Sequence, residues 1–197
     1  MYVGHGSASS GGVALTFHTA GDPLIVADIL SQANHLAVKA TFFLVGTWAA
    51  ANPGTVARIV EEGHDLGNHT WSHTDLAHLA PGPMFDEIER CANVLQSLTG
   101  SIGKWFRPSQ IDVPTAAILA QAGHAGYTTS VGFDVDPLDY TDPGAAAIEA
   151  RARPRLHPGA IVSLHTLYTG TAEAFTPVVE AVRASGLEPV TVSTLLG

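Results

Sequence analysis

The sequence predicts a single-domain α/β protein, built on a parallel sheet with helices packed outside it. Short apolar runs alternate with segments of helical periodicity, and the alternation repeats about seven times with no linker between units. The 197 residues are 46% hydrophobic, with a mean hydropathy of +0.20, so the chain can bury a full core. The alternation leaves open whether the sheet closes into a barrel. We place the domain at residues 12–197 and expect residues 1–11, rich in Gly and Ser, to be a flexible tail.

The first half of the chain predicts three strands and two helices. Apolar runs predict strands at 13–17 and 41–45, and a shorter one at 65–68. Asp22 can cap a helix over 23–35, and Pro23 suits its first position. A second helix is expected over 53–62, because Gly63 follows it as a stop signal.

The second half continues the alternation. Apolar residues recur at helical spacing in 84–98, and Gly100 closes that helix. Further helices are expected at 113–122, 143–153 and 171–185. Further strands are expected at 104–106, 127–131, 160–164 and 189–192.

The composition excludes several classes of partner. Nine Lys and Arg stand against 18 Asp and Glu, for a formal charge of −9. This balance argues against nucleic acid and against anionic membrane surfaces, because both require clustered basic residues. The single cysteine excludes an intrachain disulfide. We expect no transmembrane segment and no secretory signal peptide in this chain.

Polar side chains follow the predicted strands at the point where each strand ends. These residues include His18 after the first strand, His69 after the third, Arg107 after the fourth and His165 after the sixth. The carboxyl ends of parallel strands meet at one face of a barrel, so we expect these side chains to form one site.

His69 and His73 form the first candidate metal pair. On a helical turn, residues four apart lie on one face and can share a divalent ion. The chain contains ten histidines although only 14% of its residues are charged, and histidine is a common metal ligand. The alternative is a solvated pair at a helix start.

Several segments resemble the motifs of the polysaccharide deacetylases, the NodB-type carbohydrate esterases. Residues 63–73, GHDLGNHTWSH, resemble that family's metal-binding motif. Residues 15–17 with 21–23 resemble its first motif, and 106–108 its third. Residues 135–140 resemble the fourth motif, with Tyr where Trp is usual, and 163–165 the fifth. The resemblance runs in order through residues 12–197.

The resemblance implies a distorted (β/α)7 barrel and a divalent metal, most often zinc. It implies removal of acetyl groups from an N-acetylated or O-acetylated glycan, such as peptidoglycan or a chitin-type oligomer. It also implies a monomer that is secreted or associated with the cell envelope. In this scheme the metal activates water, an aspartate takes its proton and a histidine protonates the leaving amine.

The resemblance also assigns roles to single residues. His165 matches the acid, and Asp139 matches the carboxylate that orients it, with Asp136 as the alternative. Arg107 matches the arginine that tethers the base. The expected substrate contacts are Leu164, as an apolar wall for the acetyl methyl group, with Pro108, Trp71 and Tyr140.

The first motif departs from the family at two adjacent positions. The family has two aspartates there, the general base and a metal ligand, whereas this chain has His18 and Thr19. His18 could join His69 and His73 as a third metal ligand. Alternatively, His18 is the base, and Asp22 or water completes the metal shell. In the third alternative, the barrel is catalytically degenerate and serves as a glycan-binding or scaffold domain.

Overall fold

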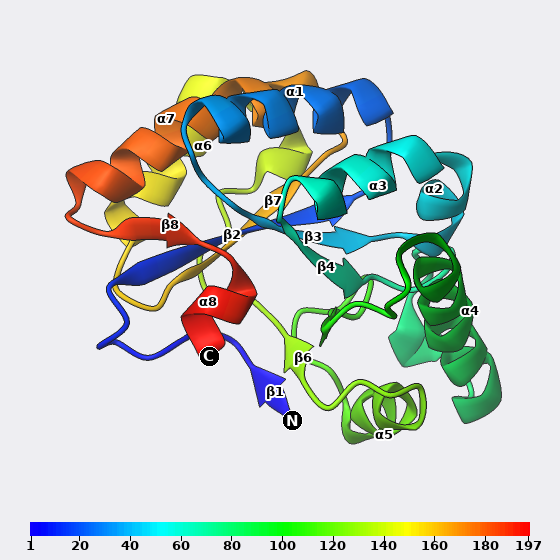
Figure 1. Ribbon diagram of the computed structural model, residues 1–197. Helices are drawn as coiled ribbons and strands as arrows, with labels where there is room; N and C mark the ends of the chain where they lie inside the picture. Colours follow the sequence, from blue (N-terminus) through cyan, green and yellow to red (C-terminus); the bar gives the residue numbers. More distant parts are fainter.

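The computed structural model describes residues 1–197 and shows a parallel sheet curled into an irregular barrel, with helices around it (Figure 1). The strands lie in the order β1-β6-β5-β4-β3-β2-β7, and β8 pairs with β2. Their bounds are β1 Tyr2–Val3, β2 Gly12–Thr19, β3 Thr41–Leu44, β4 Asp65–Asn68, β5 Trp105–Phe106, β6 Ser130–Val131, β7 Ile161–His165 and β8 Glu188–Val190.

The helices complete the βα units. They are α1 Pro23–His35, α2 Gly46–Ala51, α3 Pro53–Glu61, α4 Pro81–Thr99, α5 Ala116–His124, α6 Ala145–Ala152, α7 Thr169–Ala184 and α8 Val192–Leu196. Three 3-10 turns are η1 Leu76–His78, η2 Asp139–Thr141 and η3 Arg153–Arg155. In Figure 1, α1, α6 and α7 lie together over one side of the sheet. The single-domain α/β prediction and the distorted barrel are therefore confirmed.

The barrel closes irregularly between β6 and β7. The segment after β6 joins β7 through an isolated parallel bridge between Val135 and Val162. The Ser163 N–H also donates to the Val135 carbonyl over 2.9 Å. The barrel therefore closes through one bridge in place of a full strand pair.

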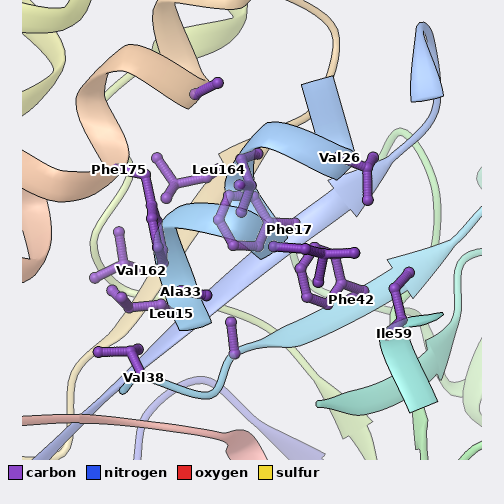
Figure 2. Packing of buried hydrophobic residues seen from close by; sticks show 14 of the residues in the cluster. Leu15, Phe17, Val26, Ala33, Val38, Phe42, Ile59, Val162, Leu164 and Phe175 are labelled. Atoms are coloured by element: carbon purple, nitrogen blue, oxygen red, sulfur yellow. The ribbon is translucent and has the colours of Figure 1, made fainter. Parts of the chain in front are cut away.

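Alternate residues of β2 face different layers. Leu15 and Phe17 belong to the core between the sheet and the helices, where Phe17 stacks on Phe42 with ring centroids 5.0 Å apart (Figure 2). Thr16 and His18 face the barrel interior instead, where both contact Arg107. The same strand therefore supplies core packing on one side and the site on the other.

Residues 1–11 differ from the expected flexible tail. β1 pairs with β6, with Tyr2 opposite Ser130, and the Gly6 N–H donates to the Gly159 carbonyl over 2.7 Å. The prediction was wrong because composition does not reveal the free donors and acceptors of a sheet edge, which this segment satisfies. None of the helices combines the length and apolar character that crossing a bilayer requires.

Candidate active site

A cleft of about 360 Å³ opens where the polar carboxyl ends of the strands meet. Its walls include His18, His73, Pro108, Tyr140 and His165. A smaller cavity of about 150 Å³ adjoins it and is lined by four imidazoles, those of His18, His69, His73 and His165. The structure thus brings together residues from β2, β7 and the loops after β4 and β5, as expected for a barrel.

His165, at the end of β7, is backed by a buried carboxylate. Its Nδ1 lies 2.8 Å from Asp139 Oδ1, and its backbone N–H donates to Asp139 Oδ2 over 2.6 Å. The Thr171 hydroxyl donates to the same Oδ2 over 2.7 Å. Because a carboxylate only accepts, His165 Nδ1 carries a proton, and its other ring nitrogen, Nε2, is left for the cleft. Asp136, the alternative orienting residue, lines the cleft without contacting this ring through a hydrogen bond.

The loop after β4 holds His69 and His73 in a conformation other than the expected helical turn. Thr70 and His73 have positive φ values of 67° and 60°, and no helix covers this segment. The centroids of the two rings nevertheless lie 4.9 Å apart. The i, i+4 argument was therefore wrong about local structure, because a strand end with two left-handed residues brings the same pair together.

One ring tautomer of His69 is set by the backbone. His69 Nδ1 lies 2.9 Å from the Arg107 carbonyl oxygen, which only accepts, so Nδ1 carries the proton. Burial, reinforced by His73, lowers the pKa of His69 well below its usual value, so the ring is neutral. His69 Nε2 therefore presents a lone pair to the cavity.

His18 donates to that lone pair. His18 Nδ1 lies 2.9 Å from His69 Nε2, and one partner must be the donor. Burial, together with His69 and Arg107, lowers the pKa of His18 well below its usual value, so this ring is also neutral. Since His69 Nε2 accepts, His18 Nδ1 carries the proton, and His18 Nε2 accepts from Arg107 Nη1 over 3.1 Å. The Ser163 hydroxyl lies 3.1 Å from the same nitrogen.

Arg107 is buried without a carboxylate partner. The residue is 1% exposed. Its guanidinium donates to Thr16 Oγ1, to His18 and to two backbone carbonyls, those of Val131 and Gly132. It also lies 4.1 Å from the centroid of the Phe43 ring. Desolvation lowers the pKa of Arg107 to about 9. A closed ring of hydrogen bonds therefore runs from the Arg107 side chain through His18 and His69 to the Arg107 carbonyl.

As arranged, these side chains do not fit a metal ion. The His69 lone pair that an ion would take is already bonded to His18. Thr19 supplies no carboxylate, and its hydroxyl is directed to the Phe17 carbonyl over 3.4 Å. Across the structure, no set of three or more His, Cys, Asp or Glu side chains is arranged to hold a metal ion. Zinc in this chain therefore stays a prediction.

Three residues expected at the site lie elsewhere. Asp22 caps α1, accepting the Leu24 N–H over 2.9 Å, and its side chain faces solvent. Leu164 is 1% exposed and packs in the core near Phe175, because its neighbours Ser163 and His165 take the interior face of β7 (Figure 2). Trp71 packs against Arg90, whose guanidinium carbon Cζ lies 4.4 Å from the centroid of the Trp71 ring. Trp71 does not line either cavity.

Other residues form the walls in their place. Leu167 lines both cavities, and Phe133 lines the larger one. Leu167 follows His165 by two residues in the loop after β7, so strand-end position could have indicated it. Phe133 likewise follows the end of β6 by two residues, so the same strand-end position could have indicated it. Tyr140 and Pro108 line the cleft, and the Tyr140 side chain is 44% exposed there.

The fold and this arrangement define a parallel α/β barrel with an imidazole-lined cleft at the carboxyl ends of its strands, and sequence comparison gives the family. Residues 5–130 match the polysaccharide deacetylase family. A chitooligosaccharide deacetylase from Bradyrhizobium sp. is 33% identical over 156 residues, which cover 79% of this chain and 71% of that protein. The chain belongs to the polysaccharide deacetylase family. It spans half or less of the length of several other curated relatives that it matches.

Three solved structures share the whole fold of this chain. A peptidoglycan N-acetylglucosamine deacetylase is 28% identical with a TM-score of 0.92, over 99% of this chain and 92% of that one. A pseudoenzyme of carbohydrate esterase family 4 from Bacillus anthracis is 25% identical with a TM-score of 0.93, over 100% of this chain and 69% of that one. A mutant of that pseudoenzyme with restored enzymatic activity has a TM-score of 0.94 to this chain.

Proposed function

We propose that this chain removes acetyl groups from an acetylated glycan of the peptidoglycan or chitin type. The observation that carries the proposal is the His165–Asp139 pair, whose imidazole lines a cleft large enough for a sugar unit. The names of similar proteins support this substrate class, since one acts on chitooligosaccharide and another on peptidoglycan. A secreted or cell-envelope location is consistent with such a substrate and stays part of the proposal.

The residues of this chain perform the proton transfer to the leaving group. In the hydrolysis, the oxygen of a water molecule bonds to the acetyl carbon and leaves in the acetate, with release of one water proton. Protonated His165 gives its Nε2 proton to the sugar nitrogen or oxygen as the bond from that atom to the acetyl carbon breaks. Asp139 holds the ring through Nδ1 and stabilises the positive charge before transfer, while Thr171 fixes the carboxylate. The Tyr140 ring centroid lies 5.3 Å from that of His165, so Tyr140 offers an aromatic wall for the sugar.

A second candidate function is glycan binding without turnover. The arrangement around His18 favours it, because His18 Nε2 accepts from Arg107 and Nδ1 donates to His69, so no free lone pair remains for a water proton. The similarity to a pseudoenzyme of the same family supports this candidate as well.

Acetate release separates the two candidates. The purified chain is incubated with chitin oligomers and with peptidoglycan, with and without added zinc or cobalt, and glycan binding is measured by calorimetry in parallel. Release of acetate that the His165→Ala variant lacks supports the deacetylase. Binding without release supports the second candidate, and the absence of both contradicts each of them.

A further inference from the structure

We infer that His18 closes the metal position of this chain by donating its Nδ1–H to His69 Nε2, so that a divalent ion must displace this hydrogen bond to reach its ligand. His18 stands where the family has an aspartate, and it would close the position whether or not the chain turns over a glycan.

The Nε2 lone pair of His69 can accept the His18 N–H or bind a metal ion, but not both at once. His69 Nδ1 is held as a donor by the Arg107 carbonyl, so Nε2 is the ring's only ligating atom. At 2.9 Å, His18 Nδ1 already occupies it. An ion binding His69 must therefore break a buried hydrogen bond, which costs it affinity.

His18 is a poor metal ligand in its observed position and tautomer. Two nitrogens 2.9 Å apart, each about 2.05 Å from zinc, subtend about 90°, whereas tetrahedral coordination separates them by about 3.4 Å. Ligation through Nδ1 would also require the ring proton to move to Nε2. Arg107 Nη1 lies 3.1 Å from that nitrogen and cannot accept a hydrogen bond, so it disfavours that tautomer.

Ser163 is the group that could accept an Nε2 proton from His18. Ser163 Oγ, 3.1 Å from His18 Nε2, can accept a hydrogen bond as well as donate one. If His18 were a ligand, Ser163 would be the acceptor for its Nε2 proton, and metal affinity would depend on that hydroxyl. If His18 closes the site, Ser163 has no bearing on the affinity. The same hydroxyl therefore distinguishes the two roles.

The test is titration of the metal-free full chain with Co²⁺ alone, followed by calorimetry and by visible absorption. His18→Ala frees the His69 lone pair, so we expect Co²⁺ affinity to rise roughly three- to tenfold over the unmodified chain. Adding His69→Ala to that variant should abolish the gain. Ser163→Ala and the exposed His124→Ala should leave affinity within about twofold of the unmodified chain.

Equal or weaker Co²⁺ binding by His18→Ala, including no detectable binding in either protein, overturns the inference. A fall in affinity in both His18→Ala and Ser163→Ala would also overturn it and would make His18 a ligand. Because the readout is affinity, failure to release acetate would count against the proposed function and leave this inference intact.

Discussion

Two histidines at the centre of the site have the same ring and opposite partners. His18 and His165 stack with centroids 4.3 Å apart and planes 17° from parallel. Asp139 accepts from His165, whereas Arg107 donates to His18. A carboxylate supports a protonated ring that can give up a proton, and a guanidinium enforces a neutral ring whose proton points the other way. The charge of the neighbouring side chain, negative for Asp139 and positive for Arg107, therefore decides the role of each histidine.

A third buried histidine extends the comparison away from the cleft. His64 lies beside β4, with its Nδ1 accepting the Ala40 N–H over 3.0 Å. Its Nε2 has no hydrogen-bond partner, and Glu62 Oε2 stays 3.8 Å away. Burial and the nearby Lys39 lower the pKa of His64 to about 4. Like His18, it is a buried imidazole without a bonded carboxylate.

The largest expected effect falls on the side of the site that contains the carboxylate. If the deacetylase proposal holds, His165→Ala should lower the turnover number by ~10²–10⁴, the usual cost of losing a proton-transfer group. Co²⁺ affinity should not change, because His165 forms no hydrogen bond with His69 or His73. Acetate release and metal titration measure the two quantities, and unimpaired turnover would break the comparison between the two histidines.

The next effect is on stability in acid. His64 is neutral when folded and has an ordinary pKa of 6.5 when unfolded, so the unfolded chain binds the extra proton. Its contribution to stability is complete above pH 6.5 and is lost as pH falls towards about 4, by at most about 1.4 kcal/mol per pH unit. His64→Gln keeps an acceptor for Ala40 and should flatten this loss. Denaturant unfolding at pH 7 and pH 5 measures it.

Exposed His124→Gln provides the matched control, since its ring faces solvent. If both variants lose the same free energy of unfolding between pH 7 and pH 5 as the unmodified chain, His64 does not cause the acid sensitivity.

The smallest effect comes from replacing the neutral side chain beside Arg107 by a negatively charged one. His18→Asp would give the buried guanidinium a carboxylate, and we expect the free energy of unfolding to rise by roughly 1 kcal/mol after the new carboxylate's own desolvation. His18→Asn, which is similar in size and neutral, should give no such gain. Equal unfolding free energies for the two variants would show that Arg107 does not need a counterion.

Much of the fold could be predicted because it rests on local patterns. The predicted helix over 23–35 has the observed bounds of α1, since Asp22 and Pro23 fix its start. Helix α2 was missed because Gly46–Ala51 is only six residues long and has no capping side chain. β1 was missed because pairing with β6 depends on a partner about 128 residues away, which no local pattern shows.

The site was only partly predictable for a related reason. Strand ends indicated His18, His69, His165 and Arg107, which the barrel then brought together. They also indicated Asp22, but this carboxylate accepts the Leu24 N–H and does not line the cleft. Sequence reasoning could not choose between ligand and base for His18, because both alternatives assumed a free lone pair and the hydrogen bonds leave none.

The most direct test of this account is nitrogen NMR of the histidine rings in the metal-free chain, with assignments from His18→Ala and His69→Ala. The account predicts neutral rings at pH 7, a proton on Nδ1 of both residues, and a coupling across the hydrogen bond from His18 Nδ1 to His69 Nε2. A His18 ring with its proton on Nε2, or one that carries two protons at that pH, would contradict it.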